Sequence, residues 1–478
     1  MIARLPRLAL GLGLGTLAAC ATVGPDYHLP GEAAANRAEA QGAFLDTGND
    51  RVAPGQPLPE RWWALYDDRV LDGLIERALA ANAGLRAASA NLERATAVYE
   101  QALDAGGLEY AAEAGAQRAQ VSAESFLLSE KLPVFNLGSG GLKISYDFDL
   151  FGKLRRASEA AHADAQATQA ALDLARIGVV AQVAGNYLDI CNANHELDIA
   201  RHSVDLQQHS LDIARRLADA GRGTVVDVTR AQAQVAALQA ALPPLQAHKR
   251  AAEYSLAALL GNTPGQLPEG VDGCATAPHP DRPIPVGDGR ALLARRPDVR
   301  AAERRLAAAT ARIGVATAEL YPDIRLGAAA GAAGLLDDFG EAATRQWSIG
   351  PLISWSIPSN GARARVAASE AGARAALAQF DQTVLDALRE TQTLLDAYAQ
   401  DLQRLQALRT AHDAARLAAE QNRRLYVGGR APYLASLDAD RTQAGSDAQV
   451  AAAEAQVSQD QVRLMLALGG GWQAAAAP

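Results

Sequence analysis

The sequence predicts a mainly α-helical protein with a small β part, in which one helix–strand–strand–long helix–helix unit occurs twice. Three observations predict this fold class: two very long stretches without proline, four segments of alternating polarity, and motifs that recur in the same order. Apolar residues make up 49% of the 478 residues, but aromatic residues only 5%. Long runs of the sequence are rich in alanine, whose small side chain favours closely packed helices. The net charge of −9 argues against a nucleic-acid partner, because such affinity comes mainly from neutralising phosphates.

The two copies are visible as motifs at a nearly constant spacing. Gly152 is matched by Gly361, 209 residues later, and the pair Gly221-Arg222 by Gly429-Arg430, 208 residues later. The helix start after Asn82 is matched, 214 residues later, by the one after Arg296. We therefore expect a first repeat over 62–270, a linker over 271–290, a second repeat over 291–470 and a tail over 471–478, after an extended N-terminal segment over 20–61.

Two long helices are predicted over 153–219 and 362–427. Some 67 residues at 1.5 Å each span roughly 100 Å, far more than a compact domain of this mass needs. Apolar residues recur every seven positions, which keeps neighbouring helices in register; one such row is Leu197, Val204, Leu211 and Ala218. Medium helices follow over 224–261 and 432–468, and we expect Pro243-Pro244 to interrupt the first of them.

Four strands are predicted, at about 108–120, 138–151, 322–333 and 345–357. Apolar and polar residues alternate in them, so each hairpin has one apolar and one mostly polar face. Four strands are too few for a closed membrane sheet, which needs about eight, whereas three copies would supply twelve. The alternative is two ordinary surface hairpins packed on helices.

We expect the first nineteen residues to form a signal peptide, because Arg4 and Arg7 precede a short apolar stretch. The small residues before Cys20 resemble the acylation motif of bacterial lipoproteins, so we expect a covalent lipid on Cys20 and, because Ala21 follows it, retention in the outer membrane. An ordinary signal peptide with a chance cysteine is the alternative. No mature segment is long and apolar enough to predict a transmembrane helix.

The two remaining cysteines are Cys191 and Cys274. An exported compartment permits a disulfide between them, but the sequence does not bring the two sulfur atoms together. We expect two free thiols.

Several motifs resemble the TolC-like outer-membrane efflux family, in its lipoprotein branch associated with resistance-nodulation-division (RND) pumps. They are Cys20 to Tyr27, Trp62-Trp63 with Asp67-Asp68, Asp147 to Lys153, and Arg295 to Glu303 ending at Tyr321-Pro322. The resemblance implies a homotrimer with a 12-stranded outer-membrane β-barrel on a long periplasmic α-helical barrel. It also implies three partners: a periplasmic adaptor, an inner-membrane RND pump and outer-membrane lipid. The first hairpin lacks the proline that the second keeps as Pro322, which leaves the start of its first strand open by a few residues.

No catalytic motif is present, so we expect neither an enzyme nor a cofactor other than the lipid on Cys20. His195, His202 and His209 recur every seven residues on one helix. Neighbouring members are then about 10 Å apart, so we expect a row of solvated or interface histidines and no metal site. A ladder of metal ions for export is the minor alternative.

Two sets of residues are candidates for function. The turns at Gly221-Arg222-Gly223 and Gly428-Gly429-Arg430 would reverse the chain after the long helices, and the resemblance places them at the periplasmic tip, where an adaptor docks. Leu434, Asp438 and Arg441 share one helical face. The resemblance makes them a periplasmic gate. Without the resemblance, three residues of this kind near a helix start more often form a solvated face.

The function implied is a passive exit duct that exports small toxic compounds or drugs in a tripartite RND-type system. The exit duct of a type I protein-secretion system is one alternative, and a periplasmic coiled-coil scaffold without a pore is another. The cargo is not readable from the sequence.

Overall fold

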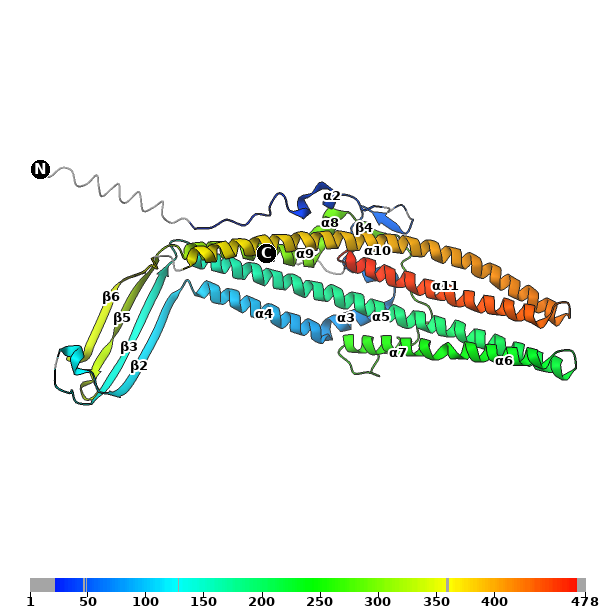
Figure 1. The fold of residues 1–478 in the computed structure, drawn as a ribbon, viewed down its shortest axis with the longest axis horizontal. Coiled ribbons are helices and arrows are strands. Elements are labelled where there is room, and N and C mark those ends of the chain that lie inside the picture. The colour runs from blue at the N-terminus through cyan, green and yellow to red at the C-terminus, as the bar shows by residue number, and fades with distance from the viewer. Residues whose placement is uncertain (1–21, 46–47, 49, 128, 358–360, 471–478) are drawn as a thin grey trace. The chain divides into compact units, whose positions relative to one another are not determined.

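The computed structural model describes residues 22–45, 48, 50–127, 129–357 and 361–470. The chain forms two compact units (Figure 1). Unit 1 contains residues 22–30 of the described part, 91–169 and 301–380, and unit 2 contains 31–90, 170–300 and the described part of 381–478. Four helices contribute residues to both units: α4 (Ala83–Asp104), α5 (Lys153–Asp219), α9 (Pro297–Ala318) and α10 (Ala362–Val427). The predicted fold class, mainly helical with a small sheet part, is confirmed.

Unit 1 contains a four-stranded antiparallel sheet with the order β2-β3-β5-β6. Its strands are β2 (Leu108–Ala119), β3 (Phe135–Phe148), β5 (Asp323–Leu335) and β6 (Arg345–Ser354). The register pairs Leu142 with Ala330 and Ala330 with Trp347, so most of the large apolar side chains of the four strands share one face. This face carries Tyr110, Leu142, Ile144, Trp347, Ile349 and Ile353, and the other carries Glu109, Glu113, Lys143, Asp147, Arg325 and Ser348.

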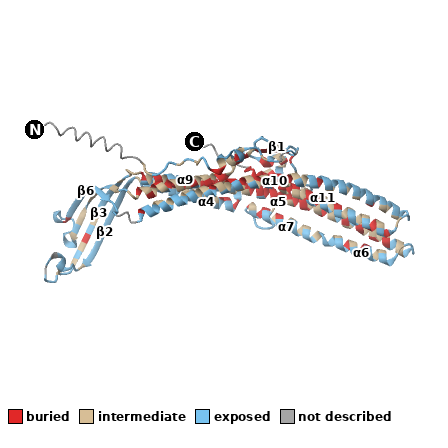
Figure 2. Ribbon diagram, turned by 45° about the horizontal axis from the view of Figure 1, so that its top comes forward, coloured by how far each residue is buried: buried red, intermediate tan, exposed pale blue. Residues whose placement is uncertain are grey.

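Both faces of this sheet are largely uncovered (Figure 2). Trp347 on the apolar face is 79% exposed, and Lys143 on the polar face has a 57% exposed side chain that pairs with Glu113 at 2.7 Å. The two hairpins join through β3 and β5 into one sheet. They are therefore not separate surface hairpins packed on helices, as the alternative interpretation had them.

Three predicted strand ends are wrong by three residues each, and the predicted end of β5, 333 instead of Leu335, is wrong by two. The second strand lies at Phe135–Phe148 instead of 138–151, and β6 ends at Ser354 instead of 357. The cause at the end of β3 is helix capping. The Asp149 carboxylate accepts the N–H groups of Leu154 and Arg155 at 3.0 and 2.9 Å, so residues 149–151 form the turn into α5.

Unit 2 contains most of the hydrophobic core. Its elements are α2 (Ala38–Gln41), α3 (Arg69–Ala81), α6 (Val225–Ala240), α7 (Leu242–Leu259), α8 (Gly289–Arg295) and α11 (Tyr433–Ala467), with a parallel pair of short strands, β1 (Val52–Pro54) and β4 (Ile284–Gly287). Trp62, Leu71, Ile75 and Met465 are almost completely buried in this core. No helix among the described residues has both the length and the apolar character needed to cross a membrane.

The predicted interruption at Pro243-Pro244 is found, as a break between two helices. Residue 241 separates α6 from α7, and both prolines lie in the first turn of α7. The missing proline N–H groups cost little there, because the first N–H groups of a helix have no partner within it.

The expectation of two free thiols is wrong. Cys191 of α5 and Cys274 of the linker form a disulfide, with their Cα atoms 5.0 Å apart. The linker returns beside α5, where the Asn194 side chain donates to the Cys274 carbonyl oxygen at 2.8 Å. No periodic pattern in the linker predicts this return, so the sequence could not place the two sulfur atoms together.

Candidate functional site

Two tight turns link the long helices to the helices that follow them, α5 to α6 and α10 to α11 (Figure 1). The Arg222 N–H donates to the Leu217 carbonyl oxygen, and the Arg430 N–H to that of Leu425, both at 2.8 Å. Gly221 and Gly429 have φ values of 68° and 69°. This left-handed conformation closes a helix end of this type and favours glycine. The duplicated sequence therefore folds into the same turn twice.

The two turns lie close to each other in unit 2. A guanidinium nitrogen of Arg222 is 4.0 Å from the position that a Cβ atom would occupy at Gly429. Five of the six predicted tip residues are exposed, and Gly223 is half-buried. The turns thus present backbone and two arginines, Arg222 and Arg430, at an accessible surface. Their role in adaptor contact stays a prediction.

An apolar cluster holds these helix ends together. Its buried members are Leu211 and Ala214 of α5, Ala231 and Val235 of α6, and Tyr433 and Leu437 of α11. The ring of Tyr426 of α10 packs against that of Tyr433 in a tilted arrangement, with ring centroids 5.3 Å apart. Burial raises the pKa of Tyr433 to about 12. The two helix hairpins therefore contact each other through side chains directly behind the turns.

The three predicted gate residues lie on the accessible side of α11. Leu434 is 52% exposed, and Asp438 and Arg441 are exposed as well. The Arg441 Nε donates to the Gln234 Oε1 at 2.7 Å, which links α11 to α6. The structure therefore gives Arg441 a contact between the two hairpins. No contact joins Asp438 to Arg441 among the residues the structure describes.

A partly buried ion pair behind this face was not predicted from the sequence. A guanidinium nitrogen of Arg423 on α10 lies 2.8 Å from a carboxylate oxygen of Asp440 on α11, whose side chain is only 10% exposed. The Ser210 hydroxyl of α5 donates to Asp440 at 3.5 Å. Residues at equal distance from the turn lie level in an antiparallel hairpin, so counting outward in both directions from the bond between residues 431 and 432 would have found this pair.

Two more acidic residues follow Asp440 on α11 in steps of seven residues, and each of them pairs with a residue of α10. Asp447 of α11 lies 2.9 Å from the Nε2 atom of His412, and Glu454 lies 2.7 Å from Arg409. Glu454 is also 3.8 Å from His195 of α5, one of the three evenly spaced histidines. No group of three metal-binding side chains occurs among the described residues. Together with Asp440, these acidic residues of α11 link α11 to α10 at three levels.

One carboxyl group farther along α11 makes stability depend on pH. Asp460 is 2% exposed, and burial, followed by the neighbouring Asp401, raises its pKa to about 6. The folded state holds this proton between roughly pH 4 and pH 6, where the unfolded chain releases it. The free energy of unfolding therefore falls as the pH rises through this range.

We expect Asp460→Asn to be more stable than the wild type by roughly 3 kcal/mol at pH 7.5, and by only about 1 kcal/mol at pH 4.5, where the folded state keeps the proton. Thermal unfolding followed by circular dichroism at both pH values measures the difference. The matched control is Asp396→Asn, because Asp396 is exposed on α10. A stability gap that is the same at both pH values would contradict the assignment.

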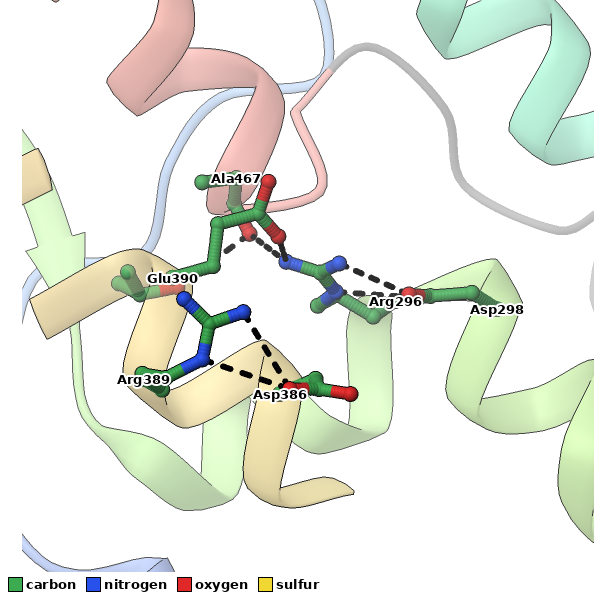
Figure 3. Close-up of polar contacts among 7 residues, drawn as sticks. Arg296, Asp298, Asp386, Arg389, Glu390 and Ala467 are labelled. Atoms are coloured by element: carbon green, nitrogen blue, oxygen red, sulfur yellow. Dashed lines mark hydrogen bonds and ion pairs between the residues drawn. The ribbon is translucent and has the colours of Figure 1, made fainter. Parts of the chain in front are cut away.

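Arg296, in the most specific of the sequence motifs, clamps the end of α11 (Figure 3). Its guanidinium group donates to the Ala467 carbonyl oxygen at 2.8 Å and pairs with Glu390 and Asp298, each at 2.8 Å. In the first repeat the Asn82 side chain donates in the same way to the carbonyl oxygen of Leu259, at 3.0 Å. Both residues sit at a break between two helices, so duplication has produced the same clamp twice.

The described residues begin after Cys20, so the predicted lipid site lies outside them. Comparison with known proteins identifies the class of the chain. The family described as "Outer membrane efflux protein" matches residues 74–262 and 289–470. The chain belongs to this family of outer-membrane channel proteins.

Individual relatives agree with this assignment along nearly the whole chain. The pyoverdine export outer membrane protein OpmQ of Pseudomonas putida is 30% identical over 446 residues, covering 88% of this chain and 91% of its own. The toluene efflux pump outer membrane protein TtgF of Pseudomonas putida is 29% identical and covers 95% of each chain. The solved structure of the outer-membrane channel OprN is 34% identical, with a TM-score of 0.87, and covers 95% of this chain and 100% of its own. The protein is an outer-membrane efflux channel that forms an exit duct.

Proposed function

We propose that this exit duct is a passive homotrimer, supplied by an inner-membrane RND pump and held to it by a periplasmic adaptor. The sheet of unit 1 carries the proposal. Its edge strands β2 and β6 have no further partner strand among the described residues, and its apolar residues are exposed. Native proteins normally cover a sheet that has two unpaired edge strands and an exposed apolar face.

Identical copies can cover those edges. The four strands alternate in direction, so β6 of one copy can pair antiparallel with β2 of the next. Three copies then give a closed sheet of twelve strands. Lipid would contact its apolar face, and Glu109, Lys143 and Arg325 on the other face would line water.

The gate in this proposal is the face of α11 that carries Leu434, Asp438 and Arg441. Three symmetry-related Asp438 side chains would form an acidic ring, which favours cations in a narrow passage. The adaptor would dock on the turns at residues 221–223 and 428–430. The accessible arginines and glycines of these turns support that role.

We propose small toxic organic compounds as cargo, with no chemical step in the duct. The relatives' names support this proposal, since they state toluene efflux and pyoverdine export. A pump for toluene moves a small compound, which makes a protein-secretion duct the weaker candidate. Acylation of Cys20 would add a lipid anchor.

The test uses the full chain extracted from outer membranes. Native mass spectrometry should show three chains, and planar bilayers should show channels whose cation preference decreases in Asp438→Asn but not in the control Asp396→Asn. Two chains per particle, or particles without conductance, would contradict the proposal. The second outcome would instead favour a scaffold without a pore.

A further inference from the structure

Residues 22–27 in unit 1 lie in a site that is shaped for them. The Val23 N–H donates to the Phe151 carbonyl oxygen at 3.0 Å, directly before α5. The Tyr27 hydroxyl donates to Glu303 of α9 at 2.6 Å, and its ring packs against the alanine cluster Ala163, Ala307 and Ala308. The Arg304 guanidinium lies 5.6 Å from the centre of the same ring. Residues 22–27 are therefore bound along their whole length.

Arg156 is the centre of this site. Its side chain is only 4% exposed, although it sits in the first turn of the long helix α5. The guanidinium donates to the carbonyl oxygens of Val23 and Gly24, both at 3.2 Å, and to the Asp26 carboxylate at 2.7 Å. Glu159 on the same helix accepts a fourth hydrogen bond at 2.8 Å. A buried arginine that makes three of its four hydrogen bonds to one short segment is arranged to hold that segment.

Two glycines make the approach possible. A Cβ atom at Gly24, whose φ is +86°, would lie 2.4 Å from the Cα atom of Gly314 on α9. A Cβ atom at Gly314 would lie 2.6 Å from the Arg156 Cγ and 2.9 Å from the Val23 carbonyl oxygen. Neither position tolerates a side chain while the segment is bound. By contrast, a Cβ atom at the helical glycine Gly372, also in unit 1, would meet no atom within 4 Å.

We propose that Arg156 and Gly314 form a clamp that fixes the position of the lipid anchor relative to the sheet. This inference rests on the proposed acylation of Cys20. Three residue steps separate Cys20 from Val23, so an extended chain can place them at most about 11 Å apart. The clamp therefore holds the acyl chains close to the junction of β3 and α5, at the end of the strands. Arg156 is a positioning residue that sets the depth at which the sheet meets the lipid.

The test places a nitroxide label at His28→Cys in the full chain, because His28 is exposed and Cys191 and Cys274 are joined. We expect an immobile label in the wild-type background and in the control Gly372→Ala. In Gly314→Ala and Gly24→Ala the label should move about an order of magnitude faster, as free terminal segments do. Arg156→Lys should lie between them, because an ammonium group does not span two carbonyl groups. A label that is equally immobile, or equally mobile, in all variants overturns the clamp.

A second measurement tests the positioning role. The mass of the N-terminal peptide reports acylation, and the amount of heat-stable oligomer in the outer membrane reports correct insertion. We expect equal acylation but severalfold less oligomer in Gly314→Ala and Gly24→Ala than in Gly372→Ala. The Gly24→Ala change lies in residues 22–27 and leaves α9 intact. A smaller amount of oligomer in this variant therefore does not come from misfolded helices. Equal amounts of oligomer overturn the positioning role, whereas an unmodified wild-type Cys20 overturns only the proposed acylation.

Discussion

Replacing Arg441 by alanine is expected to raise the open fraction of the reconstituted channel about a hundredfold. The Arg441 side chain donates to Gln234 and so joins the two helix hairpins next to the turns. A hydrogen bond from a charged group at an exposed site contributes about 1 kcal/mol. In the proposed trimer, three such contacts open together and contribute about 3 kcal/mol, which corresponds to about two powers of ten in the opening equilibrium.

Single-channel recording in planar bilayers measures this effect. Gln234→Ala should produce nearly the same increase, and the double variant should add little to either single change, because both remove one contact. Arg424→Ala is the matched control, since Arg424 has a 76% exposed side chain and its ion pair, with Glu420, lies within its own helix. An equal open fraction in Arg441→Ala and Arg424→Ala would remove Arg441 from the gate.

The second large effect is expected at Arg296. Arg296→Ala leaves the Ala467 carbonyl oxygen and the carboxylates of Glu390 and Asp298 without their shared partner. The Arg296 side chain is 12% exposed, so its loss should cost about 3 kcal/mol of stability. This corresponds to a decrease of about 5 °C in the unfolding midpoint, measured by circular dichroism in detergent.

Two further variants give reference values for the stability that Arg296→Ala is expected to lose. Asn82→Ala removes the matching neutral hydrogen bond in the first repeat and should cost about 1 kcal/mol. Arg389→Ala removes an arginine with a 69% exposed side chain that pairs with Asp386 on its own helix (Figure 3), and should change stability by less than about 0.5 kcal/mol. If Arg296→Ala and Arg389→Ala unfold at the same temperature, the contacts of Arg296 with the end of α11 are not important for stability.

The long helices could be predicted from the sequence because local signals mark both of their ends. The absence of proline and the glycines at 152, 221, 361 and 429 give the bounds Lys153–Asp219 and Ala362–Val427 that the structure has. The strand faces were predictable for a similar reason, since alternation with a period of two is a local pattern. The turns followed from two glycines with left-handed conformations.

What the sequence did not predict depends on contacts between distant residues. The disulfide requires the path of a linker without any periodic pattern. The roles of Arg296 and Arg156 require knowledge of which carbonyl groups end up beside them. Arg423 and Asp440 are an intermediate case, because their pairing follows from the position of a predicted turn. Cys20 and the adaptor-binding role of the turns stay predictions.

The disulfide between α5 and the linker has a practical consequence for dissecting the gene. A break in the polypeptide after Gly265 would fall between Cys191 and Cys274 and would lie close to the boundary of the two repeats. Two fragments co-expressed from such a split gene, each with its own export signal, would become one covalent molecule again on oxidation. The two halves could then be mutated or labelled independently, and reduction on a denaturing gel would separate them for analysis.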